Sequence, residues 1–191
     1  MKLEREKKYL VTDEQAKNLL KKSLKTIGAV QWYIDDCKLF GKNNGCRIRY
    51  TFDVNGSEEW IIATKGELMD NFTREEQESQ LNVSSEIFSL LYFKPVVAKL
   101  RYFLMFQPAE VVLDEFIQLD RPYNVSVKYI VEIETDEDFE KYEKNFDLIN
   151  PLRAEDFLKY TNKNIATISK LAPQKIIEIV RIKLIENKQP W

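Results

Sequence analysis

The stretch Leu3-Glu4-Arg5-Glu6-Lys7-Lys8-Tyr9 opens a chain of 191 residues and sets the interpretation of the rest. In a β-strand, residues two apart point to the same side of the sheet, so Glu4, Glu6 and Lys8 share one face. Two carboxylates at this spacing lie about 7 Å apart and repel by about 2 kcal/mol at an effective dielectric constant of about 20. We therefore expect a cation to compensate the two carboxylates.

The same pattern, with charged residues two apart, recurs along the first 135 residues. Strand-like runs cover 2–10, 30–40, 46–53, 58–65, 72–81, 96–106, 110–119 and 125–135, which makes about eight strands. Any single polar face is explained by solvation of a half-buried strand. One face per strand nevertheless gives seven basic and seven acidic candidates: Lys8, Arg47, Arg49, Lys65, Arg74, Lys99 and Arg101, and Glu4, Glu6, Glu76, Glu78, Asp114, Glu132 and Glu134.

These faces predict a barrel whose interior is charged. Turn signals at Asn43-Asn44-Gly45 and Asn55-Gly56 favour antiparallel neighbours. Helical patterns are expected over 12–27, 85–93, 138–146, 154–160 and 162–171, with a last helix after Pro173 that packs on the sheet. The expected fold is α+β: an eight-stranded antiparallel β-barrel, or tunnel, with flanking and C-terminal helices. We expect one domain over 1–191, with the tunnel strands and inserted helices in 1–135 and C-terminal helices in 136–191, which support the sheet or, as the alternative, plug one end of the tunnel.

Composition excludes several classes of function. The chain has no histidine, which removes Ser/His and Cys/His catalytic pairs and imidazole metal ligands, so a metal would need oxygen ligands. The formal net charge of -2 provides no general field for DNA or an anionic membrane. With a charged N-terminus, no apolar span and two cysteines, Cys37 and Cys46, outside any C-x-x-C motif, we expect a cytoplasmic protein with reduced thiols.

A charged lumen must hold water or a charged ligand, because unpaired buried ions are costly. Guanidinium groups bind phosphate oxygens in pairs, and carboxylates bind hard divalent cations. A polyphosphate with Mg²⁺ or Mn²⁺ satisfies both signs of charge. Phosphoryl transfer needs positioning and charge neutralisation rather than covalent chemistry by the protein, so the lack of histidine is no obstacle.

The ordered motifs resemble the CYTH superfamily, the triphosphate tunnel metalloenzymes. They are Glu4-x-Glu6-x-Lys8, Arg47-x-Arg49, Thr64-Lys65-Gly66, Arg74-x-Glu76-x-Glu78, Lys99-x-Arg101, Leu113-Asp114-x-Phe116 and Glu132-x-Glu134, with a weaker echo in Tyr160-Thr161-Asn162. The resemblance implies metal-dependent cleavage of a small-molecule triphosphate inside the tunnel, and a homodimer is left open. Carried over by motif, the metal ligands are Glu4, Glu6, Glu132 and Glu134, with Asp114 as an additional one.

The same resemblance gives roles to the remaining residues. The seven basic side chains listed above would grip phosphate oxygens. Glu76 and Glu78 would hold a second metal or orient the attacking water, and these alternatives stay open. Lys8 would lie near the leaving group, with a salt bridge to a neighbouring carboxylate as the equal alternative.

The superfamily includes more than one reaction. The start Glu4 to Val11 resembles tripolyphosphatase-like members, which favours hydrolysis of tripolyphosphate or of a nucleoside or thiamine triphosphate by water at the terminal phosphorus. The stretch Gln31 to Asp36 departs towards cyclase-like and thiamine-triphosphatase-like members, so a class IV adenylate cyclase is the alternative. A non-catalytic polyphosphate sensor is a further one. Trp32 and Tyr33 lie on opposite faces, and one of them is a candidate to stack on an organic ring, although core packing is the commoner role.

Overall fold

The computed structural model describes residues 2–40, 45–70 and 72–187. Its elements are β1 (Lys2–Leu10), α1 (Asp13–Leu20), β2 (Lys25–Ile34), the 3₁₀ helix η1 (Lys38–Phe40), β3 (Cys46–Phe52), β4 (Glu58–Leu68), β5 (Thr73–Gln80), α2 (Ile87–Leu91), β6 (Pro95–Met105), β7 (Glu110–Phe116), β8 (Tyr129–Glu134), α3 (Glu140–Asn145), α4 (Ala154–Lys159), α5 (Asn162–Ile165), β9 (Thr167–Ile168) and α6 (Pro173–Glu186).

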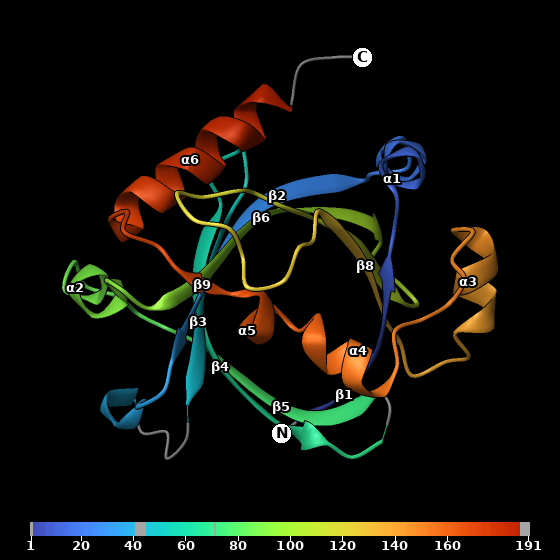
Figure 1. The fold of residues 1–191 in the computed structure, drawn as a ribbon, viewed down its shortest axis with the longest axis horizontal. Coiled ribbons are helices and arrows are strands. Elements are labelled where there is room, and N and C mark those ends of the chain that lie inside the picture. The colour runs from blue at the N-terminus through green and yellow to red at the C-terminus, as the bar shows by residue number, and fades with distance from the viewer. Residues whose placement is uncertain (1, 41–44, 71, 188–191) are drawn as a thin grey trace.

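Eight strands close into an antiparallel barrel, as predicted. Their order is β2-β3-β4-β5-β1-β8-β7-β6, and β6 pairs with β2 to close the ring. The short strand β9 adds to β6 outside this ring. Figure 1 looks into the barrel, with α1, α2, α3 and α6 around its wall and α4 and α5 across the opening.

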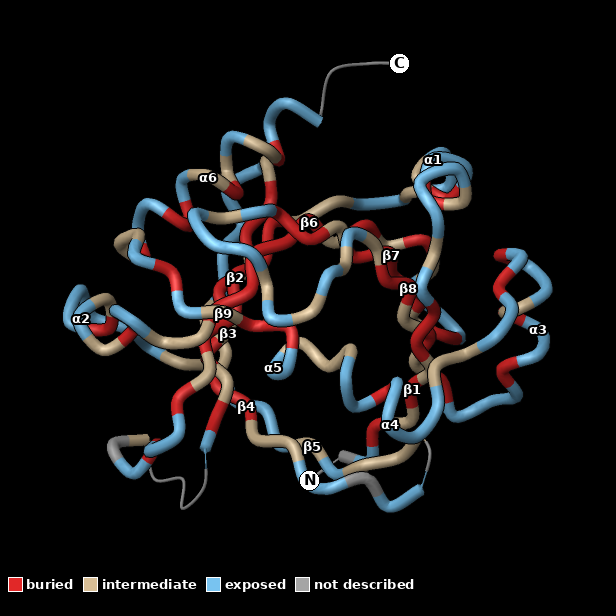
Figure 2. The backbone as a smooth tube through the Cα atoms, in the orientation of Figure 1, coloured by how far each residue is buried: buried red, intermediate tan, exposed pale blue. Residues whose placement is uncertain are grey.

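The hydrophobic core lies between the outer wall of the barrel and the helices. Along β3 the apolar Ile48 and Phe52 are buried and face outward, whereas Arg47 and Arg49 face the interior. Helix α6 packs against β2 and β6. Gly28 on β2 permits this packing, because a Cβ there would lie 2.5 Å from the Phe52 ring and 2.9 Å from Val180 on α6. Figure 2 shows that buried backbone follows the strands while the outer faces of α1 and α3 are exposed.

Most strands keep their predicted bounds within a few residues, but the first helix does not. It starts as expected with the Thr12–Gln15 capping box, yet it ends at Leu20 instead of continuing to Ile27. Leu24 is 66% exposed, and the chain pairs with β6 from Lys25 and also with β3 from Gly28. Pairing on both sides outweighs the helical spacing of the apolar residues, so the strand predicted over 30–40 instead runs from Lys25 to Ile34.

Two further boundaries differ from the prediction. The helix expected over 162–171 ends at Ile165, because Thr167 and Ile168 pair with β6. Strand β8 begins at Tyr129 instead of residue 125. The Asn55-Gly56 turn is present, with Gly56 at φ 88°, while Asn43 and Asn44 of the other predicted turn lie outside the described residues.

The prediction of reduced cysteines is wrong: Cys37 and Cys46 form a disulfide. Their spacing in the sequence gives no hint of it, whereas the register places Cys46 opposite Ile34 and the turn after β2 brings the two Cα atoms to 6.0 Å. Within the described ranges, none of the helices has the length and apolar character needed to cross a membrane.

Candidate functional site

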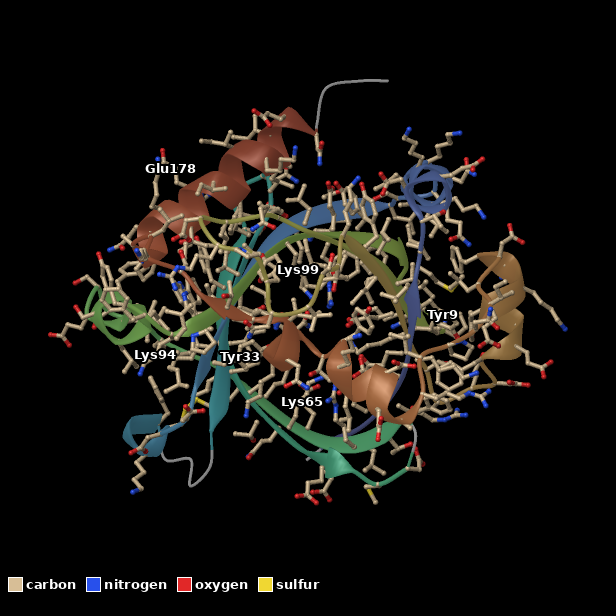
Figure 3. The ribbon with its side chains drawn as sticks, viewed as in Figure 1. Tyr9, Tyr33, Lys65, Lys94, Lys99 and Glu178 are labelled. Atoms are coloured by element: carbon tan, nitrogen blue, oxygen red, sulfur yellow. A yellow bond between two sulfur atoms is a disulfide. The ribbon has the colours of Figure 1, made fainter. Side chains whose placement is uncertain are left out.

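A cavity of about 910 Å³ occupies the inside of the barrel. Its wall includes every basic residue predicted from the sequence and six of the seven predicted acids. Asp114, the seventh, is fully buried in the wall behind Lys99 and Arg101. Figure 3 shows Lys65, Lys99 and Tyr33 inside the barrel, whereas Tyr9 lies outside between β1 and α3.

A continuous chain of ion pairs runs around the lumen. Neighbouring members approach within 4.0 Å, and acids and bases alternate throughout; Glu6, for example, contacts Arg74 with one oxygen and Lys8 with the other. In order the chain joins Arg49, Glu78, Arg47, Glu76, Lys65, Glu4, Arg74, Glu6, Lys8, Glu132, Arg101, Asp114 and Lys99. The predicted faces therefore converge into one network.

The two carboxylates of β1, Glu4 and Glu6, are paired with cations, as expected from their spacing. Glu4 accepts hydrogen bonds from Lys65 Nζ at 2.6 Å and from Arg74 Nε at 3.0 Å, and Arg74 also bonds Glu6. Burial acts to raise the pKa of Glu4, but the charges of Lys65 and Arg74 outweigh it and lower that pKa to about 2. Glu4 therefore stays ionised.

Lys8 forms the predicted salt bridge. Its ammonium group bonds Glu132 and lies 3.4 Å from Glu6, and only 2% of the residue is exposed. Burial opposes the charged form, but Glu132 and Glu6 raise the pKa of Lys8 above its usual value. Lys8 is therefore a permanent cation and cannot act as a base near neutral pH.

A second cluster lies on β6 and β7. Asp114 accepts hydrogen bonds from Lys99 Nζ at 2.5 Å and from Arg101 Nε and Nη2 at 2.8 and 2.7 Å. Because Lys99 is fully buried beside Arg101, its pKa is lowered to about 8 despite Asp114. Burial raises the pKa of Asp114, but Arg101 and Lys99 reverse the effect and lower it.

Three buried polar atoms facing this lumen have no hydrogen-bond partner among the described residues: Arg47 Nε, Arg49 Nε and Gln31 Oε1. The two guanidinium groups reach Glu78 through their terminal nitrogens, at 2.6 and 3.2 Å, and keep the Nε–H unused. A buried donor or acceptor without a partner costs about 1–3 kcal/mol. An anion in the lumen could accept hydrogen bonds from these two Nε–H groups and remove this cost.

The carboxylates supply the oxygen atoms that a hard divalent cation prefers. Glu6 lies directly across from Glu134, and Glu134 directly across from Glu110 on β7. No three described carboxylates converge on one point, because cations of the network hold several of them. The donor chemistry fits Mg²⁺ or Mn²⁺, although the side chains are arranged around Lys and Arg.

Several lumen residues were missed by the sequence reasoning. Glu110 lies 4.0 Å from Arg101, and its place opposite Glu134 follows only from the strand register. The C-terminal segment also enters the cavity wall, through Leu158, Thr161, Asn162, Lys163 and Asn164. Thus α4 and α5 lie across one end of the tunnel (Figure 1), which was the alternative role for the C-terminal helices, while α6 packs on the sheet as expected.

The two aromatic candidates separate clearly. Trp32 is 1% exposed on the outer wall, where it stacks on Trp60 with ring centroids 6.0 Å apart. Tyr33 lines the cavity beside Gln31, and burial raises its pKa to about 12. Trp32 is therefore a core residue, and of these two candidates Tyr33 is the one that faces the tunnel, where Phe103 also lies in the wall.

Comparisons with known proteins give the fold. No family model and no curated protein matches the chain. Among solved structures, the PH1819 protein from Pyrococcus horikoshii OT3 is 21% identical with a TM-score of 0.57, over 81% of this chain and 97% of that one.

Two further structures are more distant. A candidate adenylate cyclase from Bacillus halodurans is 15% identical (TM-score 0.49; 84% of this chain, 100% of that one). A candidate adenylyl cyclase from Hippeastrum with a dominant triphosphatase activity is 16% identical (TM-score 0.45; 100% and 98%). The closed eight-stranded antiparallel barrel with a charged lumen is the architecture that the resemblance to the CYTH superfamily implies, and the chain has this CYTH-like tunnel fold.

Proposed function

We propose that the protein hydrolyses a triphosphate inside the tunnel with the help of a divalent metal ion, water attacking the terminal phosphorus. The observation that carries this proposal is the gathering of seven basic side chains in one closed lumen, two of which keep a buried Nε–H without a partner. Such a wall suits a linear chain of phosphates better than a single charge, because cations project from five strands: β1, β3, β4, β5 and β6.

The basic residues would act by binding and by neutralising charge. Arg47 would donate to a phosphate oxygen through the Nε–H group that is now unused, and Arg49 would contribute its positive charge beside the phosphates. Lys65, Arg74, Lys99 and Arg101 would exchange part of their contacts with carboxylates for contacts with phosphate. Lys8, held as a cation by Glu132 and Glu6, would stabilise negative charge on the leaving group instead of accepting a proton.

Mg²⁺ or Mn²⁺ would be held by carboxylates of β1 and β8: Glu4, Glu6, Glu132 and Glu134. When bound, the metal would neutralise phosphate charge and polarise the oxygens of the reacting phosphoryl group. We assign Asp114 instead to the buried pair with Lys99 and Arg101, since three hydrogen bonds already occupy its oxygens.

The decisive experiment offers tripolyphosphate, ATP and thiamine triphosphate separately, each with Mg²⁺, Mn²⁺ or EDTA, and identifies every product by chromatography. We expect release of phosphate that stops in EDTA. Cyclic AMP with pyrophosphate from ATP would replace the hydrolase proposal with a cyclase. Binding without any turnover would make the protein a sensor.

A variant pair tests the metal site. Glu4→Gln combined with Glu6→Gln should abolish metal-dependent turnover, while tripolyphosphate still binds in EDTA because the basic side chains remain. Glu14→Gln with Glu140→Gln, two exposed acids outside the lumen, is the matched control and should keep full activity. Full turnover in the lumen variant would mean that the metal ligands lie elsewhere.

A further inference from the structure

Gln31 is an uncharged polar residue in a wall otherwise dominated by charge. It is 1% exposed, it lines the cavity between Ala29 and Tyr33 on the inner face of β2, and its Oε1 has no hydrogen-bond partner. A buried amide oxygen without a partner is unfavourable by about 1–3 kcal/mol. A group that donates a hydrogen bond would remove this cost when it enters the lumen.

Arg49, directly across from Gln31, has a hydrogen-bond donor without an acceptor. Gln31 faces Arg49 in the β2–β3 register, so their Cβ atoms lie about 5 Å apart. Arg49 Nε is a buried donor without a partner. An acceptor and a donor, both unsatisfied, thus lie side by side on the lumen wall.

A fully ionised triphosphate can satisfy only half of this pair. Its oxygens accept from Arg49, but they have no hydrogen to give to Gln31. Water does both, because it donates to Oε1 and accepts from Nε–H. The small side chain of Ala29, the neighbour of Gln31 on the same face, leaves space, and two polar partners are what an ordered water requires.

We propose that Gln31 and Arg49 together hold the water that attacks the terminal phosphorus. This inference rests on the proposed function and names the residues that position its nucleophile. Glu78, which the sequence offers for this task, already accepts hydrogen bonds from both Arg47 and Arg49. Gln31 Oε1 is free to accept.

The step balances without a base supplied by the protein. The water oxygen forms a bond to the terminal phosphorus, and the bridging P–O bond breaks with its electron pair leaving on the diphosphate. Both hydrogens of the water end on the released phosphate, as dihydrogen phosphate. Gln31 directs the lone pair of the water towards phosphorus and takes no proton.

The test separates positioning of water from binding of substrate. Gln31→Met keeps the size of the side chain but removes the acceptor, and Gln31→Glu keeps an acceptor while adding a negative charge. Turnover of tripolyphosphate with Mg²⁺ gives kcat, and calorimetric titration with tripolyphosphate in EDTA gives Kd. Thr51→Val, on the same lumen wall, is the control and should leave both quantities unchanged.

We expect kcat of Gln31→Met to fall by about a hundredfold, with Kd within about twofold of the wild-type value, because a misplaced nucleophile slows only the chemical step. Gln31→Glu should keep most of kcat but bind more weakly, because its charge repels the phosphates. Unchanged kcat in Gln31→Met, or equal loss in both variants, overturns the inference. Absence of hydrolysis by the wild-type protein overturns the proposed function itself.

Discussion

The substitution Asp114→Asn tests whether this carboxylate neutralises buried cations or binds a metal. The side chain is fully buried and accepts three hydrogen bonds from Lys99 and Arg101, at 2.5, 2.8 and 2.7 Å. Asparagine keeps the shape but leaves two cations near each other without their shared anion. Removal of one partner of a buried ion pair costs about 3–5 kcal/mol, so we expect a loss of that size in the free energy of unfolding.

The assay is urea unfolding in EDTA, followed by far-ultraviolet circular dichroism, with the m-value required to stay constant. Glu110→Gln on the same strand is the matched control. Its side chain is 40% exposed and 4.0 Å from Arg101, so its loss should change stability by no more than about 1 kcal/mol.

A second substitution strengthens the test. Adding Lys99→Met to Asp114→Asn removes the cation that has lost its anionic partner, since Arg101 still pairs with Glu132, and should restore part of the lost stability, which a double-mutant cycle measures as coupling. If Asp114→Asn unfolds like the wild-type protein in EDTA but needs more Mg²⁺ for turnover, Asp114 is a metal ligand and our reading of the pair is refuted.

Three other predictions concern two lumen residues and the disulfide. The pKa of Glu4 is lowered to about 2, so ionised Glu4 adds roughly 3 kcal/mol to the free energy of unfolding above pH 4.5, and this contribution is lost as the pH falls towards 2. The variant Glu4→Gln should therefore show a weaker dependence of Tm on pH in this range. The pKa of Lys99 is lowered to about 8, so Lys99 loses its charge above that pH, whereas an arginine there stays charged. In calorimetric titrations with tripolyphosphate in EDTA, the affinity of the wild-type protein should therefore fall relative to that of Lys99→Arg above pH 8, by up to about tenfold per pH unit. Reduction of the Cys37–Cys46 disulfide, which spans nine positions, should lower the free energy of unfolding by about 2.5 kcal/mol, and a double Cys→Ser variant should show no response to reductant.

The inward direction of the charged side chains could be predicted because side chains two apart in a strand share a face and because the two carboxylates of β1 repel each other unless a cation lies nearby. Which cation meets which acid could not, because the contact of Arg74 with Glu4 and Glu6 depends on the β1–β5 register and on side-chain reach. Glu110 was missed because the next acid on its face of the strand, Asp114, is four residues away, so the two do not form the two-residue spacing that marked the predicted glutamates.

Gln31 shows a different limit of sequence reasoning. A single glutamine in a strand forms no periodic pattern. Gln31 becomes a candidate only because its Oε1 has no hydrogen-bond partner in the folded protein. The first helix was overextended because apolar spacing in 24–27 fits a helix locally, whereas the pairing of residues 25–27 with β6 is a tertiary effect. The disulfide likewise depends on how the chain turns after β2.

The network also explains why substrate and metal should depend on each other. In the empty lumen each base is compensated by an acid, so a triphosphate that takes over Arg47, Arg49 or Lys65 leaves Glu76, Glu78 and Glu4 with weaker partners. Buried carboxylates without a counter-charge are strongly unfavourable. A divalent cation entering with the anion compensates them, and a metal without the anion would instead have to displace Lys and Arg from the same acids. The balanced charge of the lumen therefore makes each ligand bind more weakly alone than in the presence of the other.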